Sequence, residues 1–354
     1  MYKLIKEKGI RFYIPKESKI SKKLPVFYNP QMELGRDICI FIIKKFKPKN
    51  ILDAMAGTGI RAMRIFKELP QSSITANDIN SNAANLIEKN IGLNSIKLKI
   101  ANEDMNILLL KKEKFDYIDI DPFGSPIKYI SPAVSALSDN GILAVTATDL
   151  GSLYGKYIKS CRRKYNAIPL NCMFKKENAI RILIHHLQTV AAKYNKALMP
   201  IFCHSSNHYL RVYLKNNTSK KETDSILKKS GYLHYCPKCL KYETSRFNLP
   251  KICCRHEMKV SGPIWLGRLW DENLTKGFTL IRHLREESNI QTIGYYELNS
   301  FYKKYKKNPS GKIENLIKKI KAKSYQASRT HFSDTGIRSS IPHKELLKHL
   351  FAFS

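Results

Sequence analysis

The fold is decided by residues 51–62, which read ILDAMAGTGIRA. Their first half, Ile51–Ala56, is a short apolar run of the kind that forms a buried strand. Gly57 and Gly59 then allow the backbone to turn sharply, and the apolar spacing predicts a helix that begins at Ile60. A strand, a glycine turn and a helix in this order predict the first unit of a parallel β-α-β sheet.

The same alternation extends over the first two thirds of the chain. We expect further strands at residues 73–79, 96–101, 115–121 and 141–148. We expect helices at residues 35–46, 60–69, 81–93, 132–137 and 178–196, with Asn80 as the cap of the third. Two more strands, 197–202 and 209–214, are joined by a short polar turn and predict a closing antiparallel hairpin. The predicted fold class is therefore α/β, a Rossmann-like parallel sheet closed by this hairpin.

The composition indicates a polyanionic partner. The chain has 354 residues, a formal net charge of +33 and an apolar fraction of 43%, which is enough for a packed core. Such a positive field attracts nucleic acid, because neutralised phosphates release their counterions, although a lysine-rich proteome would also raise the charge. No run is long and apolar enough to span a bilayer, and the N-terminus lacks the apolar run of a signal peptide. We therefore expect a cytoplasmic protein with no membrane contact; no obligate protein partner is evident, and the oligomeric state stays open.

Acidic residues follow three successive strands of the predicted sheet. Asp53 lies in the motif at the end of the first strand, Asp78 ends the second, and Glu103–Asp104 follow the third. The carboxyl ends of parallel strands meet at one edge of a sheet, so these acids should lie near the Gly57-Thr58-Gly59 turn. Together they resemble the S-adenosylmethionine site of Rossmann-like methyltransferases. The turn alone would also fit a dinucleotide fingerprint, or a strand–helix turn without a ligand.

The motif Asp121-Pro122-Phe123-Gly124, at the end of the fourth strand, carries the chemistry. It resembles the Asp/Asn-Pro-Pro-aromatic motif of amino-group methyltransferases. An exocyclic amine is a weak nucleophile because its lone pair is delocalised into the ring, so its hydrogens must be held and its nitrogen aimed. We expect the Asp121 carboxylate to accept one hydrogen bond and to act as general base. Pro122 would aim a backbone carbonyl at the second hydrogen, and Phe123 would stack on the base.

Two acids near this sheet edge have alternative interpretations. Asp121-Pro122 could be a plain turn with Phe123 in the core, although the preceding glycine turn disfavours that interpretation. Asp149 follows the fifth strand and could either face the pocket or belong to a turn, and the sequence favours neither.

Four of the eight cysteines, Cys236, Cys239, Cys253 and Cys254, fall within one short window. In a cytosolic chain such clustering indicates a metal site rather than disulfides. Cys236 with Cys239, and Cys253 with His256, form two pairs with two intervening residues each, as tetrahedral zinc requires. We expect these four residues to bind structural zinc, with Cys254 as an alternative to Cys253. Reduced thiols without a metal are the other possibility.

The chain after residue 259 is basic and is expected to be mainly helical, whereas the polar residues 216–230 are expected to form a linker. Tyr295–Lys307 and Lys312–Lys323 alternate lysines with apolar and aromatic residues at helical spacing. This pattern predicts packed helices with a cationic outer face that could dock the backbone of a nucleic acid. A merely solvated lysine face is the alternative.

Several segments together resemble one family, the tRNA guanine-26 N2-dimethyltransferases, and its archaeal members in particular. The similar segments are FYNPQMELGRD at 27–37, DAMAGTGIRA at 53–62, DPFGSP at 121–126, WLG at 265–267 and SRTHF at 328–332. Residues 121–126 are the most specific of these, because most related methyltransferases carry a different motif there. The resemblance implies a class I methyltransferase fold, S-adenosylmethionine as methyl donor, and mono- then dimethylation of N2 of guanine 26 in tRNA.

The resemblance also implies roles for individual residues. In addition to Asp53, Gly57 and Gly59, it implies cofactor contacts from Arg36, Arg61, Asp78, Asp104 and Met105. Both arginines would suit the methionine carboxylate, which favours a bidentate guanidinium partner. The implied catalytic group is Asp121, with Pro122 and Phe123 shaping the pocket. The family's cysteine cluster binds a metal, and here His256 stands in for one cysteine.

We expect two domains with different roles. Residues 1–218 would form the methyltransferase domain with its basic N-terminal segment. Residues 219–354 would form a smaller α+β domain that binds tRNA and holds zinc at 232–258. The alternative enzyme is an adenine or cytosine amino methyltransferase acting on RNA or DNA. An inactive nucleic-acid-binding protein is disfavoured by the intact glycine turn and Asp121, and a nicotinamide-dependent oxidoreductase by the closing hairpin and the Asp-Pro-Phe motif.

Overall fold

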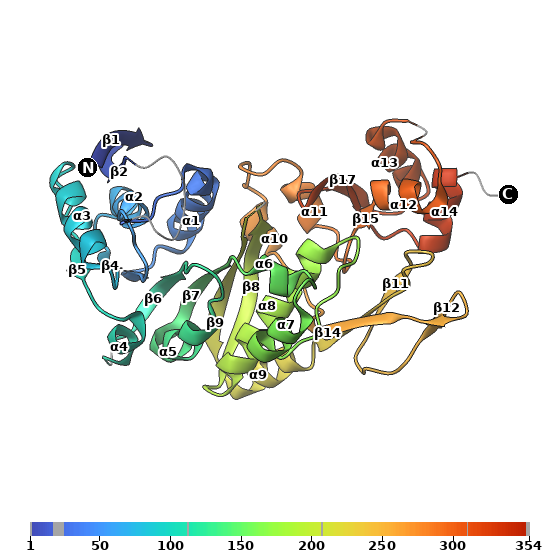
Figure 1. The fold of residues 1–354 in the computed structure, drawn as a ribbon, viewed down its shortest axis with the longest axis horizontal. Helices are drawn as coiled ribbons and strands as arrows, with labels where there is room; N and C mark the ends of the chain where they lie inside the picture. The colour runs from blue at the N-terminus through green and yellow to red at the C-terminus, as the bar shows by residue number, and fades with distance from the viewer. Residues whose placement is uncertain (1, 17–24, 112, 207, 310, 352–354) are drawn as a thin grey trace. The chain divides into compact units, whose positions relative to one another are not determined.

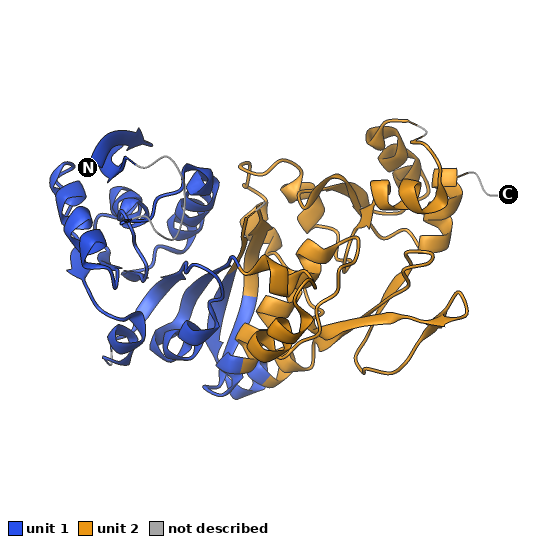
Figure 2. Cartoon of the chain, in the orientation of Figure 1, with its two compact units in different colours: residues 1–148, 190–199, 213–223 blue, residues 149–189, 200–212, 224–354 orange. Residues whose placement is uncertain are grey.

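The computed structural model describes residues 2–16, 25–111, 113–206, 208–309 and 311–351. The chain divides into two compact units, which Figure 2 shows in different colours. The first unit comprises residues 1–148, 190–199 and 213–223, and the second comprises residues 149–189, 200–212 and 224–354. The expected roles of residues 1–218 in methyl transfer and of residues 219–354 in tRNA binding stay predictions.

A seven-stranded sheet carries the order β5-β4-β3-β6-β7-β9-β8. Its strands are β3 (Asn50–Asp53), β4 (Ser73–Asn77), β5 (Lys99–Ala101), β6 (Phe115–Ile120), β7 (Leu137–Ala147), β8 (Lys196–Ser205) and β9 (Leu210–Thr218). The pairs β3–β4, β3–β6, β4–β5 and β6–β7 are parallel. Strands β8 and β9 follow one another in sequence and end the sheet, where a closing hairpin was predicted. The Rossmann-like fold class is thus confirmed.

Helices flank the parallel strands of the first unit in two groups (Figure 1). They are η1 (Pro30–Met32), α1 (Glu33–Phe46), α2 (Ile60–Glu68), α3 (Ser81–Gly92), α4 (Met105–Leu110), η2 (Ile127–Tyr129) and α5 (Ile130–Ala136). Helix α1 packs on α2, while α4 packs on α5. The Asn80 side chain accepts a hydrogen bond from the Asn82 backbone N–H at 3.0 Å, as its predicted capping role requires. Between the helices, strand residues such as Ile51 and Ile118 are fully buried.

An N-terminal hairpin that the sequence analysis missed covers part of the first unit. Strands β1 (Tyr2–Glu7) and β2 (Ile10–Pro15) pair antiparallel within the segment expected only to be basic. Every second residue of β2 is apolar and buried, and this face packs on Ile60 and Met63 of α2. The alternation is the period of a half-buried strand, a signal that the high lysine content obscured.

The second unit mixes helices with small antiparallel sheets, as the predicted α+β class requires. Its elements, some of which extend into the first unit, are α6 (Leu150–Leu153), α7 (Ile158–Tyr165), α8 (Lys175–Ala192), α9 (Lys220–Leu227), β10 (Ser230–Tyr235), β11 (Tyr242–Ser245), β12 (Ile252–Cys253), β13 (His256–Glu257), β14 (Lys259–Trp265), α10 (Glu272–Thr275), α11 (Leu284–Ser288), β15 (Tyr296–Glu297), α12 (Leu298–Tyr305), α13 (Ile313–Ala322), β16 (Ala327–Thr330), β17 (Ser333–Ser339) and α14 (His343–Phe351). The sheets have the orders β11-β10-β14, β12-β13 and β15-β17-β16.

Two local expectations were wrong. The predicted linker at 216–230 contains α9, and the region after 259, expected to be mainly helical, contains four strands besides its helices. Strands β15 and β16 are only two and four residues long, and β14 and β15 pair with strands far away in sequence, so period alone could not reveal these strands.

A buried ionic network organises the second unit. The Arg338 Nη2 atom donates to Glu177 Oε2 at 2.6 Å, and its Nε atom donates to Glu287 Oε1 at 3.0 Å. The Arg181 Nε atom donates to Glu177 Oε1 at 2.7 Å, and the His331 ring lies 2.7 Å from Glu287 Oε2. Burial raises the pKa of Glu287, but His331 and Arg338 outweigh burial and lower it to about 2. The network joins helices α8 and α11 to strand β17.

Among the described residues, we find no helix that combines the length and the hydropathy needed to cross a membrane.

Candidate active site

A cavity of about 370 Å³ lies in the first unit, at the carboxyl ends of β3, β4, β5 and β6. Ten of the predicted site residues line it, namely Arg36, Asp53, Gly57, Arg61, Asp78, Asp104, Met105, Asp121, Pro122 and Phe123. The predicted residue Gly59 is not in the cavity wall. The structure therefore brings together residues from five separate segments of sequence, as the strand-end argument predicted.

The glycine turn shapes one wall of the cavity. Gly57 has a φ of 55°, and a Cβ atom there would stand 2.8 Å from the Phe27 carbonyl oxygen. The Gly57 N–H donates to Asp78 Oδ2 at 2.9 Å. Gly59 has a φ of 76° and caps α2, with Ile87 packed against it. Gly59 thus serves the turn into the helix, while Gly57 serves both the turn and the close approach of the chain.

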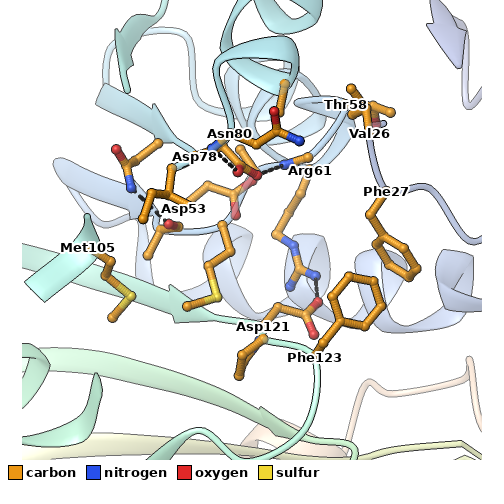
Figure 3. Close-up of a pocket in the computed structure, with 18 of the residues that line it drawn as sticks. Val26, Phe27, Asp53, Thr58, Arg61, Asp78, Asn80, Met105, Asp121 and Phe123 are labelled. Atoms are coloured by element: carbon orange, nitrogen blue, oxygen red, sulfur yellow. Dashed lines mark hydrogen bonds and ion pairs between the residues drawn. The ribbon is translucent and has the colours of Figure 1, made fainter. Parts of the chain in front are cut away.

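Asp78 closes the same wall and is held by main-chain donors. Its second carboxylate oxygen accepts from the Asn80 N–H at 3.0 Å. Burial raises the pKa of Asp78, and the hydrogen bonds from Asn80 and Gly57 partly oppose that rise. Figure 3 shows Asp78 and Asn80 side by side. The Asp104 carboxylate caps α4 by accepting from the Asn106 N–H at 2.7 Å.

Asn77 is a site residue that sequence reasoning missed. Its buried side chain donates to the carbonyl oxygens of Ala54 and Glu103, both at 3.1 Å. Its Oδ1 atom accepts from the Glu103 N–H at 3.2 Å, and its carbonyl oxygen accepts from the Ala56 N–H at 2.8 Å. Asn77 therefore ties together the loops that follow β3, β4 and β5. The signal in the sequence that could have revealed Asn77 is its position as a polar residue directly before Asp78.

Asp121 lies at the end of β6 and is paired with Arg61 from α2. The Arg61 Nη2 atom donates to Asp121 Oδ2, as Figure 3 shows, and its Nη1 atom donates to Asp119 Oδ2 at 2.7 Å. The Tyr117 hydroxyl donates to the same Asp119 oxygen at 2.9 Å. The side chains of Arg61 and Asp121 are 10% and 11% exposed, so the pair faces the cavity while Asp119 is fully buried. The guanidinium thus orients the carboxylate that the sequence singled out.

Two aromatic rings stand beside this carboxylate (Figure 3). Phe123 is 46% exposed, and its ring meets Phe27 edge to face with centroids 4.5 Å apart. The turn behind Phe123 is pinned, because the Gly124 N–H donates to Thr148 Oγ1 at 2.6 Å and the Thr148 N–H donates to the Gly124 carbonyl at 2.9 Å. A planar ligand can pack against a ring that is exposed in this way. The sequence predicted this role for Phe123 and gave Phe27 none.

Arg36 lines the cavity, but its guanidinium is held by an acid that the sequence analysis did not consider. The Nε and Nη2 atoms of Arg36 donate to the two Glu7 oxygens at 2.8 and 2.7 Å. Arg64 also donates to Glu7, at 2.8 Å, and to Asp37. Burial raises the pKa of Glu7, but hydrogen bonds and charge from Arg36 and Arg64 lower it on balance. The hydroxyl of Tyr28, another residue of the cavity wall, donates to Glu7 at 3.3 Å.

The cysteine window forms one cluster in the second unit. The ligand atoms of Cys236, Cys239, Cys253 and Cys254 all lie within 4.8 Å of one another. The predicted ligand His256 lies in β13 with an exposed side chain and is not part of this cluster. Cys254 takes its place because it begins a tight turn at positive φ, which brings its thiol to 3.9 Å from that of Cys253. Cys253 and Cys254 therefore both lie where they could bind a metal, whereas the sequence analysis treated them as alternatives.

Two remaining expectations concern the second unit. Asp149 accepts from Lys164 Nζ at 3.0 Å and from the Tyr165 hydroxyl at 2.6 Å, so it belongs to a local network with α7. In α12 and α13 the apolar residues Phe301 and Ile320 are fully buried, whereas the lysines of both helices are exposed. The helices therefore pack as predicted, with cationic outer faces.

A Rossmann-like sheet with a glycine turn, acids at successive strand ends and an Asp-Pro-aromatic motif after β6 defines a class of protein, the class I methyltransferases. Comparison with known families makes the identification specific. Residues 9–351 match the model of the N2,N2-dimethylguanosine tRNA methyltransferase family. The chain belongs to this family.

Relatives of known name agree over almost the whole chain. The tRNA (guanine(26)-N(2))-dimethyltransferase of Methanosphaera stadtmanae is 36% identical, with 97% of this chain and 95% of the relative covered. The tRNA (guanine(26)-N(2)/guanine(27)-N(2))-dimethyltransferase of Aquifex aeolicus is 32% identical over 98% of this chain and 95% of its own. The structure of Trm1 from Pyrococcus horikoshii in complex with S-adenosyl-L-methionine superposes with a TM-score of 0.85 at 30% identity, covering 98% of this chain and 99% of that one.

Proposed function

We propose that this enzyme transfers methyl groups from S-adenosylmethionine to the exocyclic N2 amine of guanine 26 in tRNA, giving the monomethylated and then the dimethylated base. Family membership and the names of its relatives support this substrate and reaction. The observation that carries the proposal is the Asp121 carboxylate, which faces the cavity beside the exposed Phe123 ring and is oriented by Arg61.

In this proposal Asp121 and Pro122 aim the amine. The N2 lone pair is delocalised into the purine, so rate enhancement must come mainly from holding the nitrogen in line with the methyl group. The Asp121 carboxylate accepts one N–H, and the Pro122 carbonyl accepts the other. When the nitrogen–carbon bond forms and the sulfur–carbon bond breaks, a proton leaves the nitrogen, and Asp121 is the base within reach. The rings of Phe123 and Phe27 pack against the guanine.

The same cavity suits the methyl donor. S-adenosylmethionine, when bound, supplies an electrophilic methyl group on a sulfonium sulfur. The missing side chain at Gly57 lets the backbone approach this ligand, and we assign Asp78 to its ribose hydroxyls and Asp104 with Met105 to its adenine. Asp53 and the turn at Gly59 complete the proposed cofactor site.

Arg36 and Arg61 remain the proposed partners of the methionine carboxylate. A guanidinium carries five N–H donors, and the hydrogen bonds to Glu7 and Asn29 use three of those of Arg36. Arg36 would therefore bind the methionine carboxylate through N–H donors other than the two that Glu7 accepts. Arg61 has a second role in this scheme, because it also orients Asp121.

For the second unit we propose a structural zinc ion held by Cys236, Cys239, Cys253 and Cys254. Four thiolates match the tetrahedral geometry of structural zinc, and their present spacing would need little rearrangement. We further propose that residues 219–354 bind tRNA through the exposed lysines of α12 and α13, while residues 1–218 carry out the chemistry. An enzyme that modifies tRNA works where tRNA is found, so we propose the cytoplasm as its location.

The test is nucleoside analysis of tRNA transcripts incubated with enzyme and isotopically labelled S-adenosylmethionine. We expect label in N2-methylguanosine and N2,N2-dimethylguanosine, and none when guanine 26 is replaced by adenine. Calorimetric titration with S-adenosylmethionine and NAD should show binding of the former alone. Label confined to methyladenosine or methylcytidine would establish the alternative amino methyltransferase instead.

A further inference from the structure

The connection between β11 and β12, together with the first residue of β12, exposes three large apolar side chains close together in sequence. Phe247 and Leu249 are each 63% exposed, and Ile252 is 72% exposed. We call these three residues the apolar tip. Single exposed apolar residues are common, but several of this size in one short loop mark an interaction surface.

The apolar tip is held by a structured support. The Ser245 hydroxyl donates to the Phe247 carbonyl at 2.7 Å and accepts from the Phe247 N–H at 3.2 Å. On the other side, Lys251 donates to Glu243 of β11 at 2.6 Å. Beyond it, the thiol of Cys253 lies 3.5 Å from that of Cys239, within the cysteine cluster. A surface fixed in this way loses little conformational entropy when it binds a partner.

The segment that contains the apolar tip is rich in positive charge. Residues 236–259 carry six lysines and arginines and two glutamates. One glutamate, Glu243, already forms ion pairs with Lys241 and Lys251. The Arg246 guanidinium lies 5.8 Å from the centroid of the Phe247 ring, in the range of a cation–π contact. An exposed aromatic ring with a guanidinium beside it, in a basic segment, fits a nucleic acid better than it fits an apolar protein surface.

We propose that the apolar tip is a tRNA-contacting surface, in which Phe247 stacks on an unpaired or terminal base and Arg246 binds an adjacent phosphate. The inference rests on the proposed function, since it assumes that tRNA is the substrate. The lysine faces of α12 and α13 would bind tRNA through charge alone. The apolar tip would add a second kind of contact, which depends on base stacking.

The experiment measures tRNA affinity by fluorescence anisotropy for the full-length enzyme and three variants. Phe247→Ala should weaken binding about ten-fold, within the range measured for loss of one base–aromatic stack. Phe247→Trp, which keeps a stacking ring, should bind within about two-fold of the wild type. The matched control is Leu110→Ala in α4, which removes an apolar side chain of 69% exposure from the first unit and should change nothing.

A fourth variant separates stacking from charge. Arg246→Gln should reduce the slope of log affinity against log salt concentration by about one, whereas Phe247→Ala should leave the slope unchanged. Circular dichroism and zinc content check that each variant is folded. S-adenosylmethionine affinity and the turnover rate at saturating tRNA should stay at wild-type values in all of them.

The outcomes distinguish this inference from the proposed function. If wild-type enzyme methylates tRNA and Phe247→Ala binds it as tightly as wild type, the apolar tip is not a tRNA contact and this inference is wrong. If Phe247→Ala instead changes the oligomeric state in sedimentation experiments, the surface joins copies of the chain, which also overturns it. Failure of wild-type enzyme to methylate tRNA would overturn the proposed function itself.

Discussion

Replacing Glu7 by glutamine should destabilise the protein and weaken cofactor binding together. Glu7 is 5% exposed and receives hydrogen bonds from Arg36 and Arg64, at distances of 2.7 to 2.8 Å. Glutamine keeps the shape of the side chain but removes its charge and one acceptor. Two buried guanidinium groups then share one neutral partner, and only Arg64 retains a second acid, Asp37.

The magnitude follows from the burial of the cluster. Breaking a buried ion pair by removing one partner costs about 3–5 kcal/mol, and the amide oxygen that remains in glutamine should bring the loss to about 2–3 kcal/mol. The matched control is Glu68→Gln, which breaks the exposed pair with Lys44 at 2.8 Å and should cost less than about 1 kcal/mol. Because Arg36 lines the cavity, Glu7→Gln should also weaken S-adenosylmethionine binding, whereas Glu68→Gln should not.

Urea denaturation and calorimetry provide the assay. The pKa of Glu7 is lowered in the folded protein from its ordinary value of 4.5, so the charge stabilises the fold fully above that pH. The difference between wild type and Glu7→Gln should therefore be constant near neutral pH and shrink as the pH falls below about 4.5. A loss no larger than that of Glu68→Gln, with unchanged cofactor affinity, would refute the assignment of Glu7 as the residue that holds Arg36.

Three further predictions concern other parts of the molecule. Gly57→Ala should lower cofactor affinity at least about ten-fold in calorimetry, because its Cβ would stand 2.8 Å from the Phe27 carbonyl at a positive φ; wild-type affinity would contradict this. Cys254→Ala should lose zinc by mass spectrometry while His256→Ala keeps one equivalent; the reverse pattern would restore the ligand set predicted from sequence. Glu287 has a pKa of about 2 in the folded protein, so its contribution to stability is present above about pH 4.5 and is lost as the pH falls toward 2. Glu287→Gln should remove this acid-dependent loss of stability from thermal melting curves measured over that pH range. Unchanged curves would argue against the network.

The sequence predicted the first unit well because its signals are local. Residues 51–62 contain an apolar strand, a glycine turn and the start of a helix within one window, and the structure has β3 and α2 there. Asp53 ends an apolar strand, and Asp78 and Asp121 each directly follow one, so a local signal singles out all three. The topology then brings such positions to one edge of the sheet without further information.

Other features depend on contacts that no local pattern encodes. Glu7 lies in a basic segment, and its importance comes from two arginines 29 and 57 residues away. Turn geometry places Cys254 rather than His256 beside the other three cysteines, and spacing alone allowed either residue. The network around Arg338 joins residues up to 161 positions apart. The sequence therefore predicted neither this network nor strand β17, which the network connects to α8 and α11.

The central claim is that Asp121 positions and deprotonates the target amine within the cavity. The most direct measurement is the single-turnover rate of guanine methylation by Asp121→Ala, with S-adenosylmethionine affinity determined on the same preparation. We expect cofactor affinity near that of wild type and a rate reduced by at least about 100-fold. A variant that binds the cofactor normally and methylates tRNA at the wild-type rate would contradict the account.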